Sequence, residues 1–267
     1  MEQAKNKQVD YKSKFKSNKN IMKYAVLSDI HSNYEALDAV LKKVDEIGVD
    51  GYAFCGDLIG YGPDPEECCQ RMMGLKNLIA VMGNHDMSLF REDFFAWFSD
   101  YAKQSMLYTA RNISKQSQEF LQTFGKEYHG KDFSMVHGSF LDPFRDYLLS
   151  AEQFILNLDK WKGNLCFVGH SHVPFIMSYK SNHMPQIDVF LGSDVSIKMI
   201  PGIRYMINPG SIGQPRDTNA KASFGIFDTK EQIFRLIRVP YDIESVQKKI
   251  ESRGLPSILS KRLGQGK

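Results

Sequence analysis

The sequence predicts an α/β fold, because strand-like and helix-like patterns alternate over the first third of the chain and strands dominate after residue 132. Short apolar runs predict three strands, and an amphipathic segment and a proline-started segment predict the two helices between them. These elements are the strands at 23–28, 51–55 and 77–82 and the helices at 34–47 and from Pro65 onward. The βαβαβ order implies a parallel sheet with its chemistry at the carboxyl ends of the strands.

The rest of the chain divides into a helical part, a strand-rich part and a helical end. Residues 87–128 are rich in aromatic residues and helix formers, which predicts two or three inserted helices whose aromatic side chains pack a subcore or wall a substrate pocket. The later strands should form a second, more antiparallel sheet, followed by closing helices at 241–253 and 256–263. The strand candidates are 132–136, 165–168, 174–178, 187–191, 203–207, 223–228 and 233–238.

Composition is that of an ordinary globular protein, with 267 residues, 42% hydrophobic and 24% charged. It excludes a disordered chain, a collagen and a coiled coil. No apolar run approaches the roughly 20 residues of a membrane span, and the N-terminus lacks the apolar core of a secretory signal. The four cysteines form no CxxC pair, and two of them are adjacent, which favours reduced thiols over a disulfide framework or a zinc site. These features predict a cytoplasmic protein with no membrane partner.

Charge is concentrated at the N-terminus. The whole chain has 34 basic and 31 acidic residues, and residues 1–22 carry six lysines against Glu2 and Asp10. We therefore expect residues 1–22 to form a basic, flexible extension. The remaining chain, with 28 basic and 29 acidic residues, is nearly neutral. That neutrality argues against a long groove for nucleic acid.

Polar side chains follow five of the predicted strands, and all are of types that bind transition metals. Strand ends of one sheet lie side by side, so groups distant in sequence can converge there. We expect an extended backbone to place Asp29 and His31 on one side, and likewise His170 and His172. The groups, in chain order, are Asp29 with His31, Asp57, Asn84 with His85, His137, and His170 with His172.

These blocks resemble the calcineurin-like metallophosphoesterases. The family pattern of D-x-H, G-D, G-N-H-D/E, a lone H and G-H-x-H is present in order between residues 29 and 172. The runs GDLIGYGPDPEE and INPGSIGQPRD look like those of the small bacterial and archaeal phosphodiesterase branch. The resemblance covers about residues 23–240 and implies a four-layer α/β/β/α sandwich with two mixed sheets. Residues 241–267 would then be C-terminal helices packed on the same domain.

The resemblance also implies a site with two divalent transition metals, drawn from Mn, Fe, Zn, Ni and Co. One metal would be bound by Asp29, His31 and His172, the other by Asn84, His137 and His170, and Asp57 would bridge the two. As in the family, His85 would act on the leaving group, with Asp86 orienting it.

Two weaker candidates for substrate binding are Tyr61 and Arg216. Tyr61 could instead pack within its loop. Arg216 could instead form a structural ion pair with Asp217 or another carboxylate.

By resemblance, the expected activity is hydrolysis of a phosphodiester in a small or nucleotide-derived substrate. A hydroxide bridging the metals would attack phosphorus in line. A diadenosine polyphosphate or other nucleotide phosphoanhydride hydrolase, a phosphomonoesterase and a protein phosphatase stay open, because they share the metal chemistry. A non-catalytic scaffold on this fold would be expected to lose ligands, and all seven are present. The superfamily's double-strand-break nucleases carry a large capping domain, for which this chain has little room. An aromatic patch within 87–128 could also pair two subunits as a homodimer.

Overall fold

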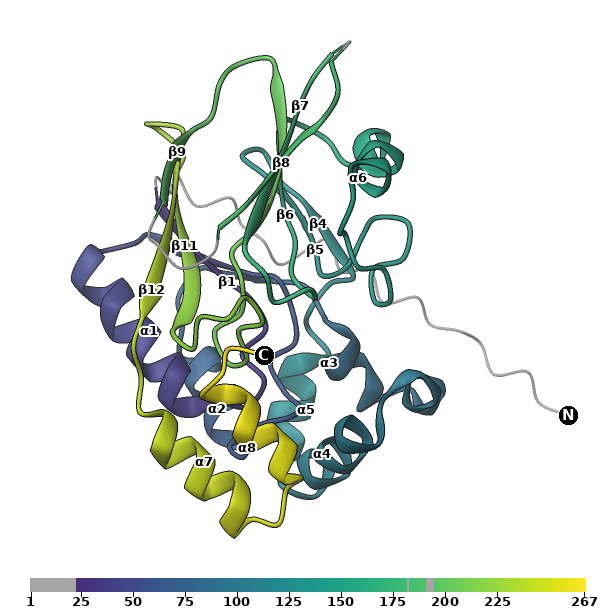
Figure 1. Ribbon diagram of the computed structural model, residues 1–267, viewed down its shortest axis with the longest axis vertical. Helices are drawn as coiled ribbons and strands as arrows, with labels where there is room; N and C mark the ends of the chain where they lie inside the picture. The colour runs from purple at the N-terminus through teal and green to yellow at the C-terminus, as the bar shows by residue number, and fades with distance from the viewer. Residues whose placement is uncertain (1–22, 182, 191–194) are drawn as a thin grey trace, which may run out of the picture.

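The computed structural model describes residues 23–181, 183–190 and 195–267, so the extension expected at 1–22 lies outside the described residues. Two six-stranded sheets pack against each other and are flanked by helices (Figure 1), which confirms the expected fold class. The first sheet contains, in spatial order, β3 (Leu78–Ala80), β2 (Gly51–Phe54), β1 (Lys23–Leu27), β11 (Ala222–Asp228), β12 (Ile233–Val239) and β9 (Val195–Lys198). The second contains β4 (Glu127–His129), β5 (Ser134–Val136), β6 (Leu165–Phe167), β10 (Ile203–Asn208), β7 (Phe175–Lys180) and β8 (Gln186–Val189).

The helices lie outside the two sheets and beside their carboxyl ends (Figure 1). The α-helices are α1 (Tyr34–Ile47), α2 (Pro65–Met73), α3 (Asn84–Ser88), α4 (Asp100–Arg111), α5 (Lys115–Leu121), α6 (Ala151–Asn157), α7 (Ile243–Ser252) and α8 (Ser257–Leu263). Within the described residues, the 3₁₀ helices are η2 (Glu92–Trp97) and η3 (Leu158–Lys160). The predicted helical segment 87–128 thus contains η2, α4 and α5, and ends as β4 begins. The sequence patterns did not reveal β4, β9, α3, α6 and η3, which are three to seven residues long and too short to show a clear period.

Strand pairing follows the prediction for β1, β2 and β3, which are parallel, and departs from it for the last two strands. We expected 223–228 and 233–238 in the second sheet, but β11 pairs antiparallel with β1 and β12 pairs with β11. The physical reason is that β2 occupies only one edge of β1, and β11 supplies hydrogen bonds to the other. The second sheet is itself mixed, since β10 runs parallel to β6 and antiparallel to β7.

Three apolar layers hold the sandwich together. The first lies between the first sheet and the α1 and α2 side, the second lies between the sheets, and the third lies between the second sheet and α6. Helix α1 shows how the sequence builds a layer. Its buried residues Leu37, Val40, Leu41 and Val44 recur at helical spacing, and each contributes about 1.5–3 kcal/mol on burial. Asn33 caps the helix by accepting a 3.1 Å hydrogen bond from the Ala36 N–H.

The C-terminal helices are fastened to the start of α2 by a buried carboxylate. Asp64 is 1% exposed and pairs with Lys249 at 2.9 Å and with Arg253 at 2.7 Å. Lys249 also pairs with Glu35 of α1 at 2.6 Å. These contacts connect α7 to the loop that follows β2, which carries Tyr61. Within the described residues, no helix has the length and apolar character needed to cross a membrane.

Candidate metal centre

The carboxyl ends of five strands, three from the first sheet and two from the second, meet at one side of the sandwich. The turn after β1 carries Asp29 and His31, and the turn after β2 carries Asp57. Asn84 begins α3, directly after the β3 segment. From the second sheet, β5 leads to His137 and β6 leads to His170 and His172. The structure therefore brings all seven predicted ligands to one place.

The first group of candidate ligands contains Asp29, His31, Asp57 and His172. They are all buried, and one ligand atom from each lies within 4.8 Å of the others. The Nε2 atoms of His31 and His172 are 3.0 Å apart. Asp29 Oδ1 lies 3.4 Å from His172 Nε2, and Asp57 Oδ2 lies 3.6 Å from His31 Nε2. Two carboxylates and two imidazoles thus point at a common position.

The second group shares Asp57 with the first and adds His137 and His170. His137 Nε2 lies 3.3 Å from Asp57 Oδ2 and 3.2 Å from His170 Nδ1. The side-chain oxygen of Asn84 completes this group at 3.1 Å from His137 Nε2. Asp57 Oδ2 therefore faces both groups, which is the position of a bridging ligand.

Backbone carbonyls select which ring nitrogen of three histidines faces the cluster. The Nδ1 atoms of His31, His137 and His172 lie 3.1, 2.7 and 2.7 Å from the carbonyl oxygens of Ile59, Cys55 and Gln214, respectively. A carbonyl only accepts, so each Nδ1 carries a proton, and each Nε2 offers a lone pair whenever its ring is neutral. For His31 and His172, two such lone pairs face each other at 3.0 Å. Only a cation between them makes that arrangement favourable, so the residues fit a metal ion.

Electrostatics agree with a centre that needs positive charge. Burial raises the pKa of Asp29 to about 7, although charge on His137 opposes the shift. Burial alone would lower the pKa of His137, but the neighbouring Asp57 carboxylate raises it to about 9. Burial lowers the pKa of His170 to about 3, so this ring is neutral at pH 7 and its nitrogens are free to ligate.

The backbone at the ligands differs from the extended geometry expected from sequence. Asp29, His31, Asp57, His170 and His172 all have positive φ, between 49° and 67°. The left-handed conformation costs a non-glycine residue about 1–2 kcal/mol, and five such residues at one site show that the surrounding structure imposes it. Ligand alignment therefore comes from successive left-handed turns. We had expected an extended backbone to place Asp29 with His31, and His170 with His172, on one side, and that expectation was wrong.

Glycines next to the ligands allow the turns to approach closely. A Cβ on Gly83 would lie 2.1 Å from Asp57 Oδ1, and one on Gly56 would lie 2.8 Å from His137 Nδ1. Both distances are too short for any side chain. The second and third strand ends can thus pack against each other only without these side chains.

His85 lies beside the ligands and is held by aromatic rings. Phe98 stacks on its imidazole at 4.5 Å between centroids, and Tyr61 lies at 4.4 Å. Its backbone N–H donates a 2.9 Å hydrogen bond to Asp57 Oδ1. Burial lowers the pKa of His85 to about 4, so the ring is neutral in this setting.

Asp86 makes different contacts from those expected. We expected it to orient the His85 ring. Its two oxygens instead accept hydrogen bonds from the backbone N–H groups of Asp57, Leu58, Ile59 and Gly83, at 2.9–3.2 Å. The physical reason is that the tight turn after β2 points three N–H groups at one buried spot, where a carboxylate is the acceptor that can satisfy them. Asp86 therefore supports the Asp57 loop.

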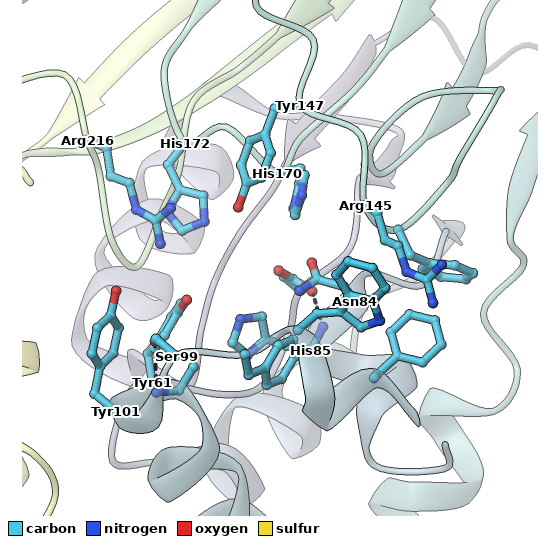
Figure 2. A pocket seen from close by; sticks show the side chains of 16 residues that line it. Tyr61, Asn84, His85, Ser99, Tyr101, Arg145, Tyr147, His170, His172 and Arg216 are labelled. Carbon is cyan, nitrogen blue, oxygen red and sulfur yellow. Dashed lines mark hydrogen bonds between the residues drawn. The ribbon is translucent and has the colours of Figure 1, made fainter. Parts of the chain in front are cut away.

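The candidate ligands open into a cavity of about 330 Å³, which we call the site cavity. Tyr61 and Arg216, the two weaker candidates, both line it. Asp217 pairs with the buried Arg238, so the alternative pairing with Arg216 does not occur. Arg216 donates to Gln214 Oε1 at 2.8 Å, and its guanidinium lies 5.8 Å from the Tyr61 ring centroid. Figure 2 shows Arg216 beside His172, one of the candidate ligands.

The expectation that aromatic side chains of 87–128 wall a pocket holds for Trp97 and Phe98, but sequence reasoning did not single out Tyr147 and Arg145. Tyr147 stacks on His170 with ring centroids 3.9 Å apart, and Arg145 lies on the same loop. Trp97 and Phe98 come from η2 and its end. The only available signal was the concentration of aromatic residues in 87–128. A loop with no motif, such as 140–150, carries no signal of its own.

Comparison with known proteins places the chain in a family. Residues 22–232 match the calcineurin-like phosphoesterase superfamily domain. The uncharacterized protein MJ0912 of Methanocaldococcus jannaschii is 35% identical over 254 residues, which are 91% of this chain and 98% of that protein.

Two solved structures extend the similarity. A metallophosphoesterase from Sphaerobacter thermophilus superposes with a TM-score of 0.80 at 33% identity, covering 93% of this chain and 100% of that one. The hypothetical protein PH1004 of Pyrococcus horikoshii OT3 shares the fold, with a TM-score of 0.75 at 20% identity and coverage of 92% and 98%. The chain belongs to the calcineurin-like phosphoesterase superfamily.

Proposed function

We propose that the protein is a dinuclear metal-dependent phosphodiesterase acting on a small phosphate ester. The observation that carries this proposal is the position of Asp57, whose Oδ2 lies 3.6 Å from His31 Nε2 and 3.3 Å from His137 Nε2. One carboxylate oxygen shared by two sets of histidines is suited to bridging two metal ions. The first ion would be held by Asp29, His31 and His172, and the second by Asn84, His137 and His170. His, Asp and Asn donors suit Mn, Fe, Zn, Ni or Co.

A diester is favoured over a monoester by the shape of the site cavity. In Figure 2, Asn84 and His85 lie between Arg145 on one side and Tyr61, Tyr101 and Arg216 on the other. All of these residues line the cavity. Space on both sides of the cluster suits a phosphate with two substituents, whereas a monoester has one.

Bound metals would supply Lewis acidity, which activates water and offsets the charge of the phosphate. The chain's own residues supply the rest. Arg216 offers a guanidinium to a phosphate oxygen beside the cluster. His85 offers its ring to the leaving-group oxygen, as its neighbours Phe98 and Tyr61 restrict the imidazole to one orientation. The aromatic walls limit the access of bulk water.

The test uses metal-stripped protein to which Mn, Zn, Ni or Mg is added singly. Hydrolysis of bis-p-nitrophenyl phosphate is compared with that of p-nitrophenyl phosphate, and bound metal is counted by elemental analysis. We expect metal-dependent cleavage, a preference for the diester, and loss of both cleavage and metal in Asp57→Asn.

Asp45→Asn is the matched control, because Asp45 is an exposed carboxylate on α1. It should retain the activity and metal content of the wild type. A protein that binds two metals but prefers the monoester would overturn the diesterase assignment. One that binds no metal would overturn the metal centre.

A further inference from the structure

The end of the site cavity farthest from Arg216 has an unusual lining. Trp97, at the end of η2, and Arg145, on the loop after β5, come together there from separate segments. The Arg145 guanidinium lies 4.6 Å from the Trp97 ring centroid and 5.5 Å from that of Phe94. Figure 2 shows Arg145 beyond Asn84, on the opposite side of the cluster from Arg216.

The large apolar ring of Trp97 is unusually exposed to solvent. The side chain is 68% exposed, although indole is among the most costly groups to leave in water. Phe94, next to it in the wall, is buried at 6%. The Arg145 guanidinium lies over the indole, and Trp97 is among the residues that line the site cavity. A flat group placed there would bury indole surface that folding leaves exposed.

The charge at this end is positive. Arg91, which also lies over Phe94, is paired with Asp93 at 2.7 Å. Arg145, by contrast, forms no ion pair within 4 Å in the described part of the chain, and the Asp93 carboxylate attracts it only at longer range. Asp57 is the one carboxylate among the described residues that line the cavity, and it belongs to the metal cluster. Aromatic walls often bind cationic ligands. Here the positive charge of Arg145, which has no ion-pair partner within 4 Å, would repel such a ligand.

Nucleobases stack in proteins on aromatic rings, including indole, and on the guanidinium plane of arginine. We propose that Trp97 and Arg145 form a stacking subsite for a flat, uncharged aromatic substituent of the phosphate ester, which in biological substrates is a nucleobase. This inference rests on the proposed function, because the phosphate must sit at the metal cluster for its substituent to reach Trp97. It names the substrate class as nucleotide-derived and excludes esters with a cationic head group.

The test measures binding, so it does not depend on turnover. The chain has two tryptophans, and Trp161 is buried at 4%. Metal-loaded protein carrying Trp161→Phe therefore reports on Trp97 alone through its fluorescence. Adenosine 5′-phosphate, ribose 5-phosphate and phosphocholine are mixed with it in a stopped-flow instrument. They share a phosphate group and differ in the substituent.

We expect adenosine 5′-phosphate to quench Trp97 and to bind about tenfold more tightly than ribose 5-phosphate, the effect of one stacked base. Phosphocholine should bind more weakly than ribose 5-phosphate. In calorimetric titrations, Trp97→Ala should remove the preference for the base, and Arg145→Gln should narrow the gap between phosphocholine and ribose 5-phosphate. Leu107→Ala, which changes an exposed apolar residue on α4, is the matched control and should keep both preferences.

Equal affinity for the nucleotide and ribose 5-phosphate, or no quenching of Trp97, would overturn the stacking subsite. So would a base preference that survives in Trp97→Ala. The proposed diesterase function is tested independently of the stacking subsite, and it is overturned if no diester is cleaved with any of the metals. Quenching by adenosine 5′-phosphate without diester cleavage would support the subsite while removing the diesterase assignment.

Discussion

The carboxylate of Asp86 accepts a 2.9 Å hydrogen bond from the backbone N–H of Asp57, which ties α3 to the loop after β2. The same carboxylate accepts from Leu58 at 2.9 Å and Ile59 at 3.2 Å. The bridging candidate Asp57 is therefore positioned by a neighbouring block of the sequence pattern. The Gly56-Asp57 motif and the Gly83-Asn84-His85-Asp86 motif therefore occur together for a structural reason, because Asp86 holds the backbone of the Asp57 loop.

Replacement of Asp86 by Asn should destabilise the protein, because an amide NH₂ would point at backbone donors that the carboxylate now satisfies. We expect the free energy of unfolding to fall by roughly 1.5–3 kcal/mol, the range for hydrogen bonds to a charged group. Urea denaturation measures the change, with the exposed Asp93→Asn as control. Unchanged stability together with a loss of activity would show that Asp86 acts on His85 after all.

Replacement of His85 by Ala should leave the metal content unchanged, since the ring is not among the seven candidate ligands. The rate of diester hydrolysis should fall by about 10²–10³-fold for alkoxide leaving groups, the usual contribution of one hydrogen-bond donor to a developing oxyanion, because the neutral ring still donates an N–H. The loss should be smaller for p-nitrophenolate, which needs little help to leave. Steady-state rates across a series of leaving groups measure this slope, with the exposed His129→Ala as control. Equal losses across the series would exclude a role at the leaving group.

The buried ion pair between Arg238 and Asp217 holds the segment that carries Arg216. Their side chains are 3% and 0% exposed. Arg238→Met should lower the free energy of unfolding by about 3–5 kcal/mol, because it leaves the Asp217 carboxylate buried without its charged partner. Arg235→Met, at an exposed position of the same strand, is the matched control. Thermal unfolding compares the two, and similar melting temperatures would contradict the prediction.

Alkaline pH should destabilise the protein partly through Tyr241. Burial raises the pKa of Tyr241 to about 12, above the value of 10.0 expected for an exposed tyrosine. The folded state therefore retains this proton where the unfolded state has lost it, so the contribution is complete below pH 10 and is lost between pH 10 and 12. Tyr241→Phe should make the free energy of unfolding fall less steeply over that interval. The free energy of unfolding is measured by urea titration at pH 9, 10 and 11. If it falls equally steeply with pH in the wild type and in Tyr241→Phe, Tyr241 is not the source of the alkaline destabilisation.

Much of the architecture follows from local pattern. The apolar runs that end in Asp29, Asp57 and His137 predict strands with polar ends, and parallel strands place such ends together. The amphipathic spacing from Leu37 to Val44 predicts α1 correctly. These features depend on residues close together in sequence, which is why they can be recognised without coordinates.

Other features depend on contacts between distant segments. The sequence of β11 is compatible with a strand in either sheet, and the free edge of β1 determines where it pairs. The positive φ angles of Asp29 and His172 are imposed by the surrounding hydrogen bonds. Neither amino-acid composition nor hydrophobic periodicity can predict them. The contact between Trp97 and Arg145, 48 positions apart, has no sequence signal at all. Residue types and their order thus specify the strands and the candidate ligands. Long-range packing specifies their orientation and the walls around them, because side-chain direction depends on backbone torsions that neighbours in space impose.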